Sequence, residues 1–165
     1  MNKKFIIILG IVIIIISLGI YFQNERNSNI VAPEESATEA QIKSLIEEFG
    51  KKIQNVYLTS PEEKVKQDIE ENYRDFLSPD LLASWIENPF QALGRLTSSP
   101  WPDRIEVENI EKINDSQYQV KGKIIEITSV EAIEGGAAVT RDITLIVDKI
   151  NGKWLISNVS VSAYK

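Results

Sequence analysis

The 165-residue sequence contains no cysteine and no histidine. Without cysteine the chain has no disulfide, no thiolate metal ligand, no cysteine nucleophile and no acceptor for a lipoprotein-type acyl anchor. Without histidine it lacks the side chain on which most serine, cysteine and metal hydrolases rely, and the usual titrating group near neutral pH. We therefore predict no cofactor and no metal site, and any enzyme built from this chain has to use carboxylates, tyrosines, lysines or arginines.

Positive charge is also scarce, with 18 Lys and Arg against 24 Asp and Glu and a net charge of −6. Lys3 and Lys4 precede a hydrophobic run; without them the counts are 16 against 24, a net charge of −8. Nucleic-acid binding and docking on anionic lipid both require clustered basic residues. The composition therefore argues against DNA, RNA and tight binding to an anionic lipid surface.

One long uncharged run begins at Phe5 and ends at Phe22 (FIIILGIVIIIISLGIYF). As a helix, about 18 residues at about 1.5 Å each reach about 27 Å, close to the roughly 30 Å hydrocarbon core of a bilayer. A cleaved signal peptide would have a shorter apolar region and a small-residue cleavage site, and residues 20–25 (IYFQNE), where the run ends, offer none. A buried core helix would show an amphipathic face, which this run lacks. The run predicts an uncleaved transmembrane anchor.

The charges beside this run predict its orientation. Lys3 and Lys4 lie before it and only Arg26 follows closely, so the positive-inside bias places the N-terminus in the cytoplasm and the rest outside. We expect residues 1–22 to be a cytoplasmic stub with a membrane helix. Residues 23–35 (QNERNSNIVAPEE) are polar and aperiodic and form a tether, and residues 36–165 form one extracytoplasmic domain.

The first half of this domain has helical periodicity and three helix-start signals. Capping boxes are predicted at Ser36 with Glu39 and at Ser60 with Glu63, and a third start at Ser78 before Pro79. Apolar residues follow each start at spacings of three and four residues. Those of the first helix are Ile42, Leu45, Ile46, Phe49, Ile53, Val56 and Tyr57. Pro89 ends or bends the third helix.

After the break at residues 97–103 the apolar period changes from 3.6 to 2. We predict about four antiparallel strands, with a bulge near Asn109 in the first. Gly135-Gly136 is predicted to close a two-residue hairpin that places Ile124 opposite Val147. Asn151-Gly152 is predicted to close the next, with Val147 opposite Ile156 and Lys149 opposite Trp154. Helices followed by an antiparallel meander predict an α+β fold in which about three helices pack on one face of a curved sheet.

Two segments resemble the NTF2-like superfamily, the cystatin-like α+β roll: residues 73–82 (YRDFLSPDLL) and residues 151–159 (NGKWLISNV). The resemblance covers residues 36–165 and implies a cone whose sheet wraps around the helices and encloses an apolar pocket. In that superfamily the pocket is catalytic in some members and filled or ligand-binding in others. Membrane-tethered members that resemble VirB8 and TcpC-type subunits act as assembly parts without catalysis.

Six residues are candidates for the lining of such a pocket. Glu126 and Arg141 fall on the core-facing side of their strands, where a charge needs a partner or access to water. The predicted register separates them by four residues, about 13 Å, which is too far for a direct bond. Tyr73, Trp85, Tyr118 and Trp154 are the aromatic candidates, and the alternative for each is an ordinary core position.

Three pairs of neighbouring glutamates have a simpler explanation than a metal site. The paired acids Glu47-Glu48, Glu62-Glu63 and Glu70-Glu71 point apart on a helix, so they indicate a solvated face rather than a metal site.

Three functions remain open at this point. The first is protein–protein assembly or self-association at a cell envelope by a single-pass, non-enzymatic protein. The second is binding of a small apolar ligand in the cone. The third is a histidine-free isomerase or dehydratase that uses Tyr118 with Glu126.

Overall fold

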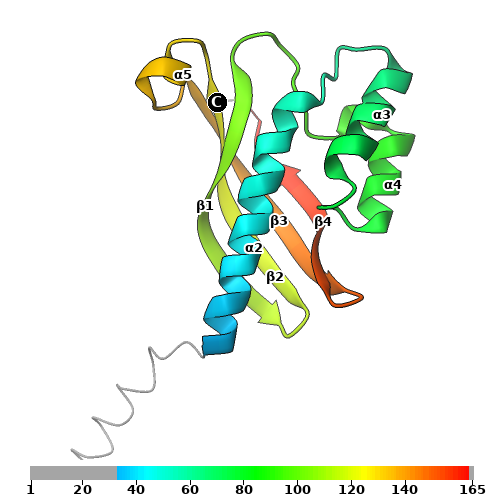
Figure 1. The fold of residues 1–165 in the computed structure, drawn as a ribbon, viewed down its shortest axis with the longest axis vertical. Helices are drawn as coiled ribbons and strands as arrows, with labels where there is room; N and C mark the ends of the chain where they lie inside the picture. The colour runs from blue at the N-terminus through cyan, green and yellow to red at the C-terminus, as the bar shows by residue number, and fades with distance from the viewer. Residues whose placement is uncertain (1–32, 164–165) are drawn as a thin grey trace, which may run out of the picture. The chain divides into compact units, whose positions relative to one another are not determined.

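The computed structural model describes residues 33–163, and the elements follow the order helices first, sheet second (Figure 1). The helical elements are α2 (Pro33–Lys52), η1 (Ile53–Asn55), α3 (Glu62–Tyr73), α4 (Pro79–Glu87), η2 (Pro89–Gln91) and α5 (Glu131–Glu134). The strands are β1 (Trp101–Asn114), β2 (Gln117–Ile127), β3 (Val139–Ile150) and β4 (Lys153–Val161). The predicted α+β class is confirmed. The described residues from Thr38 onward belong to one compact unit, and the run at residues 5–22 lies outside the described residues.

The sheet is an antiparallel meander in the order β1-β2-β3-β4, as predicted. The hairpin at Asn151-Gly152 has the predicted register, with Val147 opposite Ile156 and Lys149 opposite Trp154. Asn151 and Gly152 both have positive φ, 51° and 82°, which is the backbone that a two-residue turn of this kind requires.

The predicted bulge in β1 is confirmed by a register shift between Val107 and Asn109. Gly122 of β2 faces Val107 at this irregularity, and a Cβ atom added to Gly122 would lie 2.3 Å from the carbonyl oxygen of Glu106. The close approach of the two backbones therefore requires glycine at this position.

The predicted register between β2 and β3 is wrong. Ile124 faces Arg141 rather than Val147, a shift of six residues. The strands do not continue to Gly135-Gly136, because β2 ends at Ile127 and residues 131–134 form the single turn α5. Gly135, with φ of 82°, is the C-cap of that turn, so the glycine pair ends a helix instead of closing a hairpin.

One of the three predicted N-caps is confirmed. The Ser78 hydroxyl caps α4 by accepting a hydrogen bond of 3.2 Å from the Leu81 amide. Ser36 lies inside α2, which begins at Pro33, so its predicted cap is wrong. At α3 the N-cap residue is Pro61, which precedes the first helical residue Glu62, and no side chain caps the helix. The predicted cap at Ser60 is therefore wrong.

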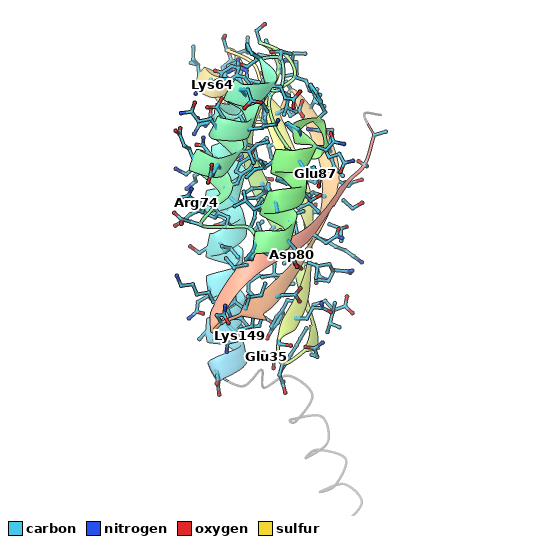
Figure 2. The ribbon with its side chains drawn as sticks, turned by 90° about the vertical axis from the view of Figure 1, so that its right-hand side faces the viewer. Glu35, Lys64, Arg74, Asp80, Glu87 and Lys149 are labelled. Atoms are coloured by element: carbon cyan, nitrogen blue, oxygen red, sulfur yellow. The ribbon has the colours of Figure 1, made fainter. Side chains whose placement is uncertain are left out.

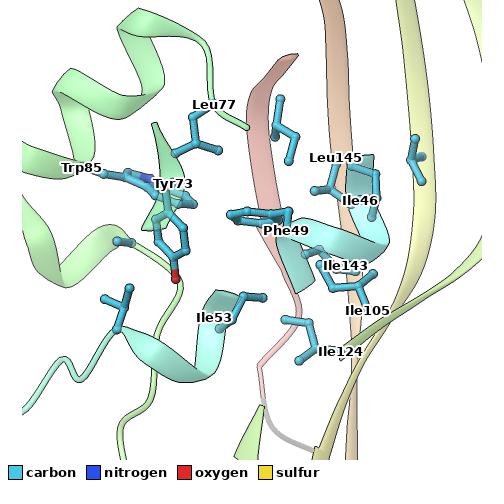
Figure 3. Packing of buried hydrophobic residues seen from close by; sticks show 14 of the residues in the cluster. Ile46, Phe49, Ile53, Tyr73, Leu77, Trp85, Ile105, Ile124, Ile143 and Leu145 are labelled. Atoms are coloured by element: carbon cyan, nitrogen blue, oxygen red, sulfur yellow. The ribbon is translucent and has the colours of Figure 1, made fainter. Parts of the chain in front are cut away.

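The core lies between the sheet and the helices (Figure 3). α2 contributes Ile42, Ile46 and Phe49, all fully buried. The predicted stripe continues beyond the end of α2: Ile53 in η1 and Val56 after it are buried, whereas Tyr57 is 45 % exposed. The sheet face opposite carries Ile105, Val120, Ile124, Ile143, Leu145, Val147 and Ile156. Charged side chains of α3 and α4, such as Lys64, Arg74 and Glu87, lie on the outside (Figure 2).

Candidate functional site

The six predicted site residues form three contacting pairs. Tyr73 pairs with Trp85 at a ring-centroid distance of 5.7 Å, and Tyr118 with Trp154 at 5.3 Å. Glu126 forms an ion pair with Arg141. Tyr118 and Glu126 lie eight residues apart on the continuous strand β2, about 26 Å at a rise of about 3.3 Å per residue. The structure therefore does not bring Tyr118 and Glu126 together as an acid–base pair.

Tyr73 lies in the core between helix and sheet, with its ring between those of Trp85 and Phe49 (Figure 3). The ring centroids of Tyr73 and Phe49 are 5.1 Å apart in an edge-on arrangement, which is favourable for aromatic pairs. The Tyr73 hydroxyl donates a hydrogen bond of 2.7 Å to the Leu93 carbonyl, and burial raises the pKa of this phenol well above its usual value. Tyr73 is therefore a satisfied, neutral core residue.

Tyr118 and Trp154 lie where β2, β3 and β4 run side by side next to the Asn151-Gly152 hairpin. Tyr118 is buried and Trp154 is half-buried, and their rings meet nearly at right angles, at 84°. The Lys149 ammonium lies 5.5 Å from the centroid of the Trp154 ring, within cation–π range. This pair closes the core at the hairpin end of the sheet.

Glu126 and Arg141 lie on the core-facing side of β2 and β3, near the end of the sheet that carries α5. The Arg141 Nε and Nη2 atoms are 2.8 and 2.7 Å from the Glu126 Oε1 atom. The predicted separation of about 13 Å is wrong, because the observed register places Arg141 opposite Ile124, diagonal to Glu126. Diagonal neighbours are within reach of long side chains. The side chains are 3 % and 13 % exposed, so the pair is nearly dehydrated.

The segment that joins β2 to β3 covers this end of the sheet. The Glu131 carboxylate accepts a hydrogen bond of 2.9 Å from the Thr128 amide and another from its hydroxyl, and these bonds lower the pKa of Glu131. The Ala138 amide donates a hydrogen bond of 2.9 Å to the Glu126 carbonyl. Ile133 of α5 is 87 % exposed, so the turn adds no large side chain to the core.

Two polar arrangements were not predicted from the sequence. In α3 the Lys64 ammonium lies 2.6 Å from the buried Asp68 carboxylate, and this bond raises the pKa of Lys64. The Arg95 guanidinium lies 5.2 and 5.1 Å from the ring centroids of Tyr57 and Trp101. The i,i+4 spacing of Lys64 and Asp68 was a usable signal. The contacts of Arg95 join segments that are far apart in the sequence, so no local pattern indicates them.

The acidic pairs lie on solvated helix faces, as the sequence predicts. Glu62 and Glu63 both pair with Lys66, and Glu70 pairs with Arg74. No cluster of three or more possible metal ligands occurs among residues 33–163. Every buried side-chain nitrogen or oxygen in this part of the chain has a hydrogen-bond partner. The polar atoms of the interior are thus already satisfied within the protein.

Two of the hollows that the described residues form lie on the surface. One, of about 460 Å³, lies over α3 between Gln67, Glu70, Glu71, Arg74 and Asp75. The other, of about 220 Å³, lies between α2 and β1 and is lined by Glu47, Lys51, Arg104, Ile105 and Glu106. None of the six predicted site residues lines either hollow.

Comparisons with known proteins give little further information. Over the described residues, no helix has both the length and the apolar character needed to span a bilayer. No family model matches the sequence, and no curated protein matches it. Among solved structures, the chain is similar to a DUF4783 family protein from Bacteroides uniformis at 10 % identity and a TM-score of 0.37. The match covers 76 % of this chain and 96 % of the other, and similarity at this level does not establish a shared fold.

Proposed function

We propose that this protein is a single-pass, membrane-anchored subunit whose extracytoplasmic α+β domain acts in protein–protein assembly at the cell envelope and has no enzymatic activity. The observation that carries the proposal is the arrangement of the six candidate residues. They contact one another in three pairs, and Tyr73, Trp85 and Tyr118 are at most 5 % exposed. A binding or catalytic pocket needs polar groups that converge on open space. The surface is therefore the better candidate for function.

The sequence supports the membrane part of the proposal. The uncharged run at residues 5–22 has the length of a membrane helix, and Lys3 and Lys4 precede it. The resemblance to NTF2-like domains, including membrane-tethered assembly subunits, supports the same assignment. In this account the anchor holds an acidic, histidine-free domain on the outer side of the membrane.

The two alternatives receive less support from the described residues. A small apolar ligand would have to displace the ring contacts among Phe49, Tyr73 and Trp85. An isomerase or dehydratase would need a carboxylate beside a tyrosine, and Glu126 is held by Arg141. Neither arrangement favours these functions over assembly.

Affinity capture of the full chain from membranes tests the proposal. A C-terminally tagged chain would be purified after chemical cross-linking and solubilisation in several mild detergents. We expect co-purification of at least one defined envelope protein, or of an untagged second copy, in stoichiometric amount. The control carries the same tag on the anchor, residues 1–35, without the domain. Recovery of the tagged chain alone in every detergent, or of the same proteins with the control, would contradict the proposal.

A further inference from the structure

Among residues 33–163, Arg95 is the arginine that forms no ion pair. The other three arginines form the ion pairs Arg74–Glu70, Arg104–Asp103 and Arg141–Glu126. The chain as a whole is acidic, with a net charge of −6. Charged groups of two partners in an interface are arranged to complement one another. The Arg95 guanidinium is therefore a place where a carboxylate from another molecule would be complementary.

Neutral acceptors hold the Arg95 guanidinium in a fixed position. Its Nε atom donates a hydrogen bond of 2.9 Å to the Thr97 carbonyl, and its Nη1 atom donates one of 3.2 Å to the Tyr57 hydroxyl. Its Nη2 atom donates to the Ser98 carbonyl. A guanidinium has five N–H groups, so one N–H on each terminal nitrogen remains available to an acceptor from outside. A side chain that is already ordered loses little conformational entropy when a partner binds.

The backbone beside this guanidinium is also fixed. The Arg95 amide donates a hydrogen bond of 2.7 Å to the Val56 carbonyl, and the Leu58 amide donates one of 3.0 Å to the Arg95 carbonyl. These two bonds form a parallel bridge between Tyr57 and Arg95. Both side chains therefore project from a backbone that is held in place by contacts between distant segments.

Aromatic rings border the cation at the surface. The Cζ atom of Arg95 lies 5.2 Å from the ring centroid of Tyr57 and 5.1 Å from that of Trp101. Tyr57 is 45 % exposed and Trp101 is half-buried, and Leu96, the next residue in the chain, is 54 % exposed. Tryptophan, tyrosine and arginine are the residues most enriched in binding hot spots. This cluster of Tyr57, Arg95 and Trp101 can bury apolar surface and a carboxylate in the same contact.

A second copy of the chain is a poor occupant of the cluster. In a two-fold contact the same patch of each copy faces the other, which would bring two unpaired guanidinium groups together. Like charges that face each other across an interface are unfavourable. Nucleic acid is also a poor occupant, because its binding needs several basic residues on one face and Arg95 stands alone in the cluster.

Resting on the proposed assembly function, we infer that the Tyr57–Arg95–Trp101 cluster binds a segment of a partner protein in which an aspartate or glutamate is flanked by apolar side chains. The carboxylate accepts hydrogen bonds from the two remaining N–H groups of Arg95. The flanking apolar side chains pack on the rings of Tyr57 and Trp101.

Two matched peptide probes test this inference on the full chain in mild detergent. One is a fluorescein-labelled hexapeptide with a single glutamate between leucines, and the other has glutamine in its place. We expect fluorescence anisotropy to show at least about fivefold tighter binding of the glutamate probe, because hydrogen bonds to a charged acceptor are stronger than those to a neutral one. In nitrogen-15 spectra of the chain, the Arg95 Nε–H signal should shift with the glutamate probe and much less with the glutamine probe.

Substitutions show whether the cluster is the binding site. Arg95→Gln should remove the difference between the two probes, while Arg74→Gln should not, because Arg74 already pairs with Glu70. Tyr57→Ala should weaken binding of both probes at least about threefold, while Ile113→Ala should not, although Ile113 is a comparable 50 % exposed. Circular dichroism and urea unfolding would check that each variant is folded. The Nε–H signal of the unmodified chain provides a measurement that needs no substitution.

Several outcomes would overturn the inference. They are equal binding of the two probes, absence of binding, a difference that persists in Arg95→Gln, and self-association of the full chain that Arg95→Gln abolishes. A partner captured from membranes equally well by the Arg95→Gln chain would also overturn it, and the assembly function would stand. Capture of no partner by the unmodified chain would instead count against the assembly function.

Discussion

The Glu126–Arg141 ion pair is the residue-level feature in which sequence and structure differ most. The alternation of β2 places Glu126 on the core-facing side, and this part of the prediction is confirmed by its 2 % exposure. Whether the two side chains meet depends on the register between β2 and β3. That register was predicted from a hairpin at Gly135-Gly136, and the prediction is wrong. The face on which Glu126 lies could thus be predicted from a local period, whereas its burial in contact with Arg141 depends on pairing between distant segments.

We predict that breaking this ion pair destabilises the fold strongly. Removal of one partner of a buried ion pair leaves an uncompensated charge and costs about 3–5 kcal/mol. Glu126→Ala and Arg141→Ala should each lower the free energy of unfolding by about this amount, measured by urea unfolding of the full chain in detergent. The double variant Glu126→Leu, Arg141→Met should recover most of the loss. Single variants that differ from wild type by less than about 1 kcal/mol would mean that the pair is solvated.

The two glycine-containing turns show what local sequence can and cannot predict about the elements. Asn151-Gly152 requires positive φ at both residues, and the flanking strands have the register that such a turn dictates. Gly135 and Gly136 also have positive φ, but they follow α5 and serve as its end. Because glycine adopts positive φ in hairpins and helix ends alike, the dipeptide alone does not distinguish the two.

Helix boundaries differed from prediction for a related reason. Ser78 has the side chain, the following proline and the helix-facing geometry of a cap. Ser36 has a comparable sequence context but lies inside α2, so a capping pattern states only that a helix is able to start there. The apolar stripe was the more reliable signal, because burial against the sheet involves the whole helix.

The approach of α2 to β1 leads to a prediction at the level of elements. A Cβ atom on Gly50 would lie 2.5 Å from the Ile105 backbone nitrogen and 3.1 Å from its Cβ atom, and Gly50 is buried. Alanine gains about 1 kcal/mol over glycine in helix propensity. Overpacking typically costs about 1–3 kcal/mol, and more where backbone has to move. We therefore expect Gly50→Ala to lower the free energy of unfolding in spite of its better propensity.

The matched control for Gly50→Ala is Ser44→Ala, at an exposed position of the same helix. Its expected effect is a stabilisation of about 0.5 kcal/mol or less, from propensity alone. Both variants would be compared with wild type by urea unfolding. If Gly50→Ala stabilised the chain as Ser44→Ala does, α2 would not be held against β1 as closely as the structure indicates.

For the molecule as a whole, the change of apolar period from 3.6 to 2 predicted helices followed by a meander, and both are present. The sequence did not indicate that its aromatic candidates contact one another, because these contacts join α2 with α3, α3 with α4, and β2 with β4. Nor did it indicate that β4 is covered by the connection between α3 and α4, which bonds to its backbone through Phe76 and Ser78. Both properties arise only when distant segments pack.

The central claim is that an anchored chain presents this domain outside the membrane, and a protease-protection assay tests it most directly. Intact cells that express the chain with a C-terminal epitope would be treated with external protease, with a cytoplasmic protein as the control for cell integrity. The account predicts that the epitope is lost from the membrane fraction of intact cells while the cytoplasmic control survives. An epitope that is shielded until lysis, or one that appears in the soluble fraction without any membrane-bound chain, would contradict it.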